Sequence, residues 1–284
     1  MTETSPTPWC FEASDGYQLV CHHWKPSAGT ATKARIVILH GIQSHAGWYQ
    51  NLGHILSRSG IEVLMPDRRG SGSNLTDRGH TTSSRRLIKD ITEICDRWNQ
   101  TSDLGLKPYL AGISWGGKLA CATVASRPDQ FQGLILIAPG LFAKVRPTFL
   151  TQIKILICAI MFPRTKFEIP LSDPKLFTEQ KVWQEFISSD KQTLRKATAR
   201  FFVASRMLDL RLKRIAQKVV IPVYLQLAEL DRIVNNERIT KYCHEFATKR
   251  ITVKTYPNSH HTLEFEPDPI RNDYAEDIAR WISS

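Results

Sequence analysis

The sequence lacks the features that mark a membrane-spanning or secreted protein. No apolar run in its 284 residues approaches the roughly 18 residues that a helix needs to cross a bilayer. The start, MTETSPTPWCFEAS, has neither the basic residues nor the apolar stretch of a signal peptide. Six cysteines occur without a CxxC pair and without a cysteine and histidine spacing suited to zinc. We therefore expect a soluble, cytoplasmic protein with small buried thiols and no bound metal ion.

Negative charge is scarce in one segment of the chain. Residues 141–218 contain 16 lysines and arginines but only six aspartates and glutamates, so they hold +10 of the net charge of +11. Such a segment would attract phospholipid headgroups, an anionic membrane surface, or the phosphates of coenzyme A or an acidic carrier protein. The alternative is that these side chains form ordinary solvated helix faces. No recognised DNA or RNA motif accompanies the charge, so no nucleic-acid partner is expected.

Short apolar runs rich in β-branched residues alternate with segments that mix charged and apolar residues at helical spacing. The runs cover residues 35–41, 61–67, 108–114, 133–140, 221–231 and 251–258. This alternation predicts an α/β fold in which buried, mostly parallel strands form a central sheet flanked by helices. Residues 17–24 are predicted to form an antiparallel edge strand, residues 269–282 a closing helix, and residues 1–8 a loose tail.

The strand pattern stops in residues 141–218, where basic, helix-rich sequence indicates an insertion. Within it, residues 155–162 form an apolar run flanked by Lys154 and Arg164. Eight residues are too few to span a bilayer. Three interpretations remain open: a helix buried against the core, a surface that meets lipid, or the wall of an acyl pocket.

One serine lies between two glycines in Gly112-Ile113-Ser114-Trp115-Gly116, which fits the pattern G-x-S-x-G. A nucleophile on a sharp turn between a strand and a helix needs strained backbone angles, and the glycines leave room for the close approach of the two elements. The turn also puts Ser114 at the positive end of the following helix, where developing negative charge is stabilised. Since an apolar run precedes the pattern and an alanine-rich segment follows it, Ser114 is a candidate nucleophile.

Five segments together resemble the α/β-hydrolase family, and within it the monoacylglycerol lipase and lysophospholipase-like serine hydrolases. They are HGIQSHAGWY (40–49), DRRGSG (67–72), GISWGG (112–117), LAELDRIV (227–234) and SHHTLEFE (259–266), in the family's order. The resemblance implies the α/β-hydrolase fold, with a core made of residues 1–140 and 219–284. It also implies that the insertion at 141–218 is a helical lid over the active site.

The resemblance further implies the partners of the nucleophile. A serine hydroxyl needs a base within hydrogen-bond reach and a third group that orients the base. In this family an acidic residue and then a histidine follow the serine along the chain. Asp231 ends a predicted strand and matches the family pattern, with Glu229 as the alternative. The family's H-x-L pattern places the base at His261, with His260 as the alternative.

The other motifs are assigned supporting roles. The backbone N–H groups of Ile42 and Trp115 would form the oxyanion hole, one following an early strand and the other following the nucleophile. By resemblance, His40 and His45 are hydrogen-bonding residues of the oxyanion loop rather than catalytic groups. The DRRGSG segment lacks the ending of a phosphate-binding loop and is expected to brace the active site, with Asp67 structural rather than metal-binding.

These features predict a serine hydrolase that cleaves a carboxylic ester of a lipid-like substrate, of monoacylglycerol or lysophospholipid type, through an acyl-enzyme and without a cofactor. One alternative is a thioesterase or acyltransferase that acts on acyl-coenzyme A or an acyl-carrier protein, because the same three residues serve any acyl transfer. Another is a non-catalytic binding module on the same fold. The expected partners are a small acyl ester and, through the basic segment, an anionic lipid or membrane surface at which the protein is peripheral.

Overall fold

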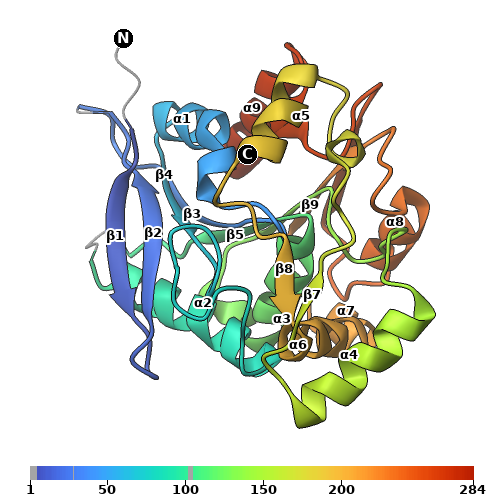
Figure 1. Cartoon of the computed structure of the whole chain (residues 1–284). Coiled ribbons are helices and arrows are strands. Elements are labelled where there is room, and N and C mark those ends of the chain that lie inside the picture. Colours follow the sequence, from blue (N-terminus) through green and yellow to red (C-terminus); the bar gives the residue numbers. More distant parts are fainter. Residues whose placement is uncertain (1–4, 28, 102–104) are drawn as a thin grey trace.

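The computed structural model of the chain describes residues 5–27, 29–101 and 105–284 (Figure 1). Its centre is a sheet with the strand order β1-β2-β4-β3-β5-β6-β9-β10. The strands β1 and β2 run antiparallel to their neighbours, and the others pair in parallel. The bounds are β1 (Thr7–Glu12), β2 (Gln18–Trp24), β3 (Ala34–Leu39), β4 (Ile61–Pro66), β5 (Tyr109–Ile113), β6 (Leu134–Ile137), β9 (Val223–Ala228) and β10 (Ile251–Tyr256).

Burial of the strands follows their position in the sheet. Every residue of β3, β6 and β9 is buried, as their short apolar runs predicted for strands covered on both faces. The prediction of burial was wrong for β10, which lies at the sheet edge and buries only Tyr256 fully. The prediction of an edge strand at residues 17–24 was also wrong, because β1 pairs along the outer side of β2. Residues 7 and 8 thus belong to a strand, and residues 1–4 of the predicted tail lie outside the described residues.

Helices cover both faces of the sheet. The helices α1 and α9 pack together on one face, and α2 and α3 pack together on the other (Figure 1). The bounds are α1 (Gln50–Arg58), α2 (Ser84–Asn99), α3 (Trp115–Ser126), α8 (Asn236–His244) and α9 (Ile270–Ser283). The predicted closing helix is therefore present as α9. None of the helices in the described residues has the length and apolar character of a membrane span.

Residues 141–218 lie outside the central sheet. They form α4 (Phe149–Met161), α5 (Lys181–Ser189), α6 (Ala199–Asp209), α7 (Leu212–Ala216) and a two-stranded sheet of β7 (Lys166–Glu168) and β8 (Lys196–Thr198). The α4 helix packs on α6 through Ile155 and Ala159, which are its only buried residues. The interpretation of the apolar run as a helix buried against the core is wrong, because Ile160 is 85% exposed. One face of the run packs on α6, with Phe167 of β7 beside this contact, and the other face is exposed.

Candidate active site

Ser114 occupies a strained turn between β5 and α3. Its backbone has φ 51° and ψ −123°, a conformation that L-residues rarely adopt outside functional sites. A side chain at position 112 would come within 2.5 Å of Gly116 O, and one at position 116 would come within 2.2 Å of Leu39 O. Only glycine at both positions allows the strand and the helix to approach so closely. The G-x-S-x-G pattern is thus a steric requirement of this turn.

The structure brings Ser114, His261 and Asp231 into one chain of hydrogen bonds. The Ser114 Oγ lies 2.8 Å from His261 Nε2, and His261 Nδ1 lies 2.6 Å from Asp231 Oδ2. Because a carboxylate only accepts, Nδ1 carries the proton and Nε2 is left to accept from the serine hydroxyl. Both His261 and Asp231 are buried, so the hydrogen bonds between them are shielded from water. This is the geometry of an activated nucleophile.

The Asp231 carboxylate is held in place by the backbone that follows it. Its Oδ1 accepts hydrogen bonds from the N–H groups of Ile233 (2.7 Å) and Val234 (2.9 Å). With one oxygen fixed in this way, the other faces the histidine ring. The alternative acid, Glu229, instead accepts from the N–H of Asn258 and takes no part in the chain of hydrogen bonds.

The alternative base also has a different partner. The N–H of His260 donates to Glu266 Oε1 at 2.8 Å, and its ring Nδ1 lies 3.2 Å from the same oxygen. Two adjacent histidines therefore face different carboxylates, and only His261 reaches Ser114. This carboxylate contact turns the His260 ring away from Ser114 and holds the segment that carries both histidines.

The loop after β3 lies against Ser114. A Cβ built on Gly41 would lie 3.8 Å from Ser114 Oγ. The backbone of Ile42, the next residue, is therefore close to the serine. On the other side of Ser114, Trp115 is the first residue of α3. The His40 ring binds Gly41 O (2.7 Å) and the N–H of Arg68 (2.9 Å). Burial lowers the pKa of His40 to about 3, so the ring is neutral and serves as a hydrogen-bonding strut.

The other predicted supporting residues also form hydrogen bonds with the backbone or with neighbouring side chains. Asp67 accepts from the N–H groups of Ala46 (2.9 Å) and Ser73 (2.8 Å), which links the DRRGSG loop to the loop after β3. The His45 ring Nε2 lies 2.9 Å from Asp190 Oδ2, at the end of α5. Through this contact the loop beside Ser114 is bound to the segment 141–218.

Residues that were not predicted from the sequence also reach the site. The Phe177 ring lies edge-on to His261, with 6.1 Å between the ring centroids, and Trp115 Nε1 donates to Ser205 Oγ of α6. Both Phe177 and Ser205 belong to the segment 141–218. Arg68 donates to two carbonyl oxygens of the loop after β3. A phenylalanine and a serine in the segment 141–218 carry no local pattern, and only the double arginine in DRRGSG could have drawn attention to Arg68.

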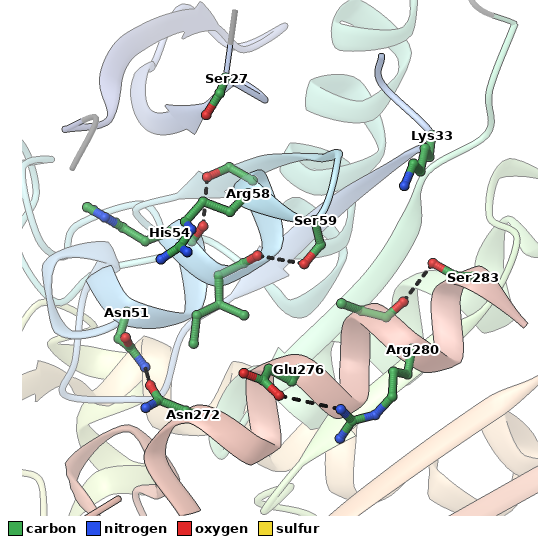
Figure 2. Close-up of a pocket in the computed structure, with 13 residues that line it drawn as sticks. Ser27, Lys33, Asn51, His54, Arg58, Ser59, Asn272, Glu276, Arg280 and Ser283 are labelled. Atoms are coloured by element: carbon green, nitrogen blue, oxygen red, sulfur yellow. Dashed lines mark hydrogen bonds and ion pairs between the residues drawn. The ribbon is translucent and has the colours of Figure 1, made fainter. Parts of the chain in front are cut away.

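A separate cavity of about 740 Å³ lies between α1 and α9, away from Ser114 (Figure 2). Its rim is polar, and several of its groups bind one another. Asn51 Nδ2 donates to Asn272 Oδ1 at 3.2 Å, and Arg280 lies 3.4 Å from Glu276. None of the residues of the hydrogen-bond chain at Ser114 lines this cavity, so it takes no part in the chemistry of the serine.

Comparison with known proteins assigns the chain to a family. The model for the family described as "Serine aminopeptidase, S33" matches residues 30–268, which include Ser114, Asp231 and His261. The chain belongs to the S33 family. The family takes its name from an aminopeptidase, whereas several relatives of this chain are named as lipases.

Individual relatives of this S33 member are similar over nearly the whole chain. The monoglyceride lipase of Homo sapiens is 27% identical over 273 residues, which cover 95% of this chain and 88% of that protein. The monoglyceride lipase of Saccharomyces cerevisiae, solved as a soluble variant with a substrate analogue, has a TM-score of 0.87 at 21% identity and covers 98% and 95% of the two chains. The monoacylglycerol lipase of Paleococcus ferrophilus has a TM-score of 0.82 at 23% identity, covering 93% and 98%. The predicted α/β-hydrolase fold is confirmed.

One buried acid of this S33 member, Glu264, links the turn that follows His261 to the helices α1 and α9. Glu264 follows His261 on a single 3₁₀ turn (Leu263–Phe265) and accepts from the N–H of Asn51 (2.8 Å) at the start of α1 and from Tyr274 OH on α9. Burial raises the pKa of its carboxyl from an ordinary 4.5 to about 7, although these hydrogen bonds oppose the shift. Between about pH 4.5 and pH 7, the folded protein therefore keeps a proton on Glu264 that the unfolded chain releases.

Stability is therefore expected to fall as the pH rises through this window, because the unfolded state binds fewer protons there than the folded state. The glutamine of Glu264→Gln cannot ionise, so the variant should not lose stability as the pH rises through this window. Relative to the wild type, the variant should gain about 1 to 3 kcal/mol in free energy of unfolding between about pH 4.5 and pH 7, measured by urea denaturation. The exposed Glu276 provides the control, and Glu276→Gln should leave the pH dependence as it is. Parallel pH profiles for wild type and Glu264→Gln would contradict the assignment.

Proposed function

We propose that the protein is a serine hydrolase that cleaves the carboxylic ester of a lipid-like substrate of monoacylglycerol or lysophospholipid type through an acyl-enzyme. The observation that carries the proposal is the hydrogen-bond chain from Ser114 through His261 to Asp231 at a strained strand-to-helix turn. The lipase names of the relatives support the ester as the bond and a glyceride as the substrate class.

In the proposed reaction, Ser114 Oγ forms a bond to the ester carbonyl carbon while its proton passes to His261 Nε2. The carbonyl π electrons move onto oxygen and produce a tetrahedral oxyanion. When the oxyanion collapses, the bond to the leaving alcohol breaks and His261 supplies the proton that the alcohol takes with it. Water then repeats the sequence on the acyl-enzyme, releasing the fatty acid and restoring Ser114. Asp231 holds the His261 tautomer and stabilises the imidazolium that forms twice in the cycle.

The oxyanion is assigned to the backbone N–H groups of Ile42 and Trp115. Gly41 and Ser114, the residues that precede them, face each other closely, and α3 begins at Trp115 with its positive end toward the serine. Each such donor contributes roughly 3 to 4 kcal/mol to lowering the barrier in comparable sites. Main-chain donors leave the side chain of Ile42 to contact the acyl group, whereas the Trp115 ring packs against Arg68 and donates to Ser205.

The proposal is tested by measuring fatty-acid release from a monoacylglycerol and a lysophospholipid, with an acyl-coenzyme A of equal chain length for comparison. We expect kcat/KM to be higher for at least one of the two oxyesters than for the thioester. Efficient turnover of the thioester alone would contradict the ester assignment. No turnover of any of the three by folded protein would contradict the assignment of an acyl hydrolase.

Residues 141–218 are proposed to be a lid that delivers the lipid substrate from a membrane surface. The segment contacts His261 through Phe177 and Trp115 through Ser205. Its α4 helix exposes a continuous set of apolar side chains, which are Phe149, Leu150, Ile153, Leu156, Ile157, Ile160 and Met161. Lys154 within α4 and Arg164 just after it are also exposed, so the surface combines apolar area with positive charge, as a contact with anionic lipid requires. A cytoplasmic, peripheral location fits the free cysteines of the chain.

The lipid contact is tested with the double variant Leu156→Ser/Ile160→Ser. Both side chains are more than half exposed, so the substitutions spare the fold. We expect partitioning onto vesicles of phosphatidylcholine and phosphatidylserine to fall about 10- to 100-fold, since two apolar side chains no longer enter the interface. Turnover of a short, water-soluble ester should stay close to wild type. The matched control, Leu75→Ser/Val220→Ser, removes exposed apolar residues elsewhere. If the two double variants partition equally onto vesicles, the proposed contact of α4 with lipid is wrong.

A further inference from the structure

The peptide group that joins Gly41 to Ile42 is held by its carbonyl oxygen. Arg68 Nη1 donates to Gly41 O at 3.1 Å, and the ring Nδ1 of His40 lies 2.7 Å from the same oxygen. Because the N–H of Arg68 donates to His40 Nε2, the neutral ring carries its proton on Nδ1 and also donates to Gly41 O. Two donors thus fix the direction of this carbonyl. The N–H of Ile42 belongs to the same planar group and must point the opposite way.

The same guanidinium also holds the next carbonyl. Arg68 Nη2 donates to Ile42 O at 2.8 Å, so one side chain bridges the carbonyls on both sides of the Ile42 Cα. A planar fork can fix two peptide groups at once, whereas the compact ammonium of a lysine cannot. A cation at the oxygen end of a peptide group also polarises it, which makes its N–H a stronger donor.

Arg68 occupies an unusual environment for a structural arginine. It is 6% exposed, and its guanidinium carbon lies 4.8 Å from the ring centroid of Trp115 and 5.2 Å from that of Phe201 on α6. Burial lowers its pKa to about 9, so it remains a cation at neutral pH. Its Nε has no hydrogen-bond partner among the described residues. A buried cation with an unpaired N–H destabilises a fold, so its presence beside the nucleophile indicates a role other than packing.

We propose that Arg68 is a positioning residue of the oxyanion hole, which holds the Gly41–Ile42 peptide so that the N–H of Ile42 faces the oxygen that develops beside Ser114. The inference rests on the proposed function of Ser114. The close approach of Gly41 to Ser114, where an added Cβ would lie 3.4 Å from the serine Cβ, puts this peptide within reach of the reacting carbonyl. Phe201 extends the arrangement to the segment 141–218, because its ring covers the guanidinium.

The test compares Arg68→Met with Arg69→Met. Methionine keeps much of the apolar length of the side chain and removes the donors. Arg69 is the matched control because it is also buried (7% exposed) and lies in the same loop, but pairs with Asp15 and Asp90. The readouts are kcat and KM for an ester, and the affinity for a trifluoromethyl ketone, which adds to the serine and forms a tetrahedral adduct bearing an oxyanion.

For Arg68→Met we expect a roughly 10- to 100-fold loss in kcat, little change in KM, and a loss of ketone affinity that matches the loss in kcat/KM. Arg69→Met should keep the kcat and ketone affinity of the wild type, although both variants lower the Tm. Arg68→Lys should give an intermediate loss, and it replaces Arg68→Met if the latter does not fold.

Equal ketone affinity in wild type and folded Arg68 variants would overturn the inference, and so would an equal loss in Arg69→Met. The experiment distinguishes a failure of the proposed function from a failure of the role assigned to Arg68. If the wild type forms the ketone adduct but hydrolyses no ester, the ester assignment is wrong, and the affinities of the Arg68 and Arg69 variants still decide the role of Arg68.

Discussion

Ser114→Ala is expected to lower kcat for ester hydrolysis by roughly 10⁴- to 10⁶-fold, the loss that follows removal of an attacking serine whose base remains in place. The variant loses the only oxygen within hydrogen-bond reach of His261 Nε2 among the described residues, at 2.8 Å. The fold should survive, because alanine removes one oxygen and leaves the glycines on which the turn depends. Alanine at φ 51° is strained, as serine already is, so the Tm should change little.

The measurement combines steady-state kinetics with labelling by a fluorophosphonate probe, followed by mass spectrometry of the adduct. Wild-type protein should carry the label on Ser114, and Ser114→Ala should carry none. Wild-type-like turnover by the alanine variant would overturn the proposed mechanism. Absence of label on a well-folded wild type that also turns over no ester would favour a non-catalytic binding module on the same fold.

His261→Ala is expected to lower kcat about as far as Ser114→Ala, because the two residues act as one unit. Without the ring, no base takes the serine proton and no acid protonates the leaving alcohol. The neighbouring His260→Ala should cost less than about 10-fold, since the backbone N–H that binds Glu266 remains and its ring faces that carboxylate. The adjacent position and the similar burial make His260 a matched control.

The losses in kcat of the two alanine variants decide between the two histidines. A larger loss in His260→Ala than in His261→Ala would show that the base had been assigned to the wrong ring. Equal, small losses in both variants would exclude histidine as the base.

The sequence by itself determined the layout of the core and the candidate residues of the active site. The apolar runs became the strands β3, β4, β5, β6 and β9, because a strand covered on both faces must be mostly apolar. The G-x-S-x-G pattern located the turn, because α3 lies so close to β5 at Gly112 and to the end of β3 at Gly116 that neither position has room for a side chain. Both signals are local, and a local constraint is visible in a short stretch of sequence.

What depended on contacts between distant segments was decided only by the tertiary structure. The exposed face of α4 could not be read from residues 155–162, because an apolar helix has the same composition whether it is buried or not. The place of β2 in the sheet was settled by pairing with β1, which an alternating pattern does not specify. Arg68 became recognisable as a clamp on Gly41 and Ile42 only when β3 and β4 were adjacent, since 26 residues separate the guanidinium from the second carbonyl.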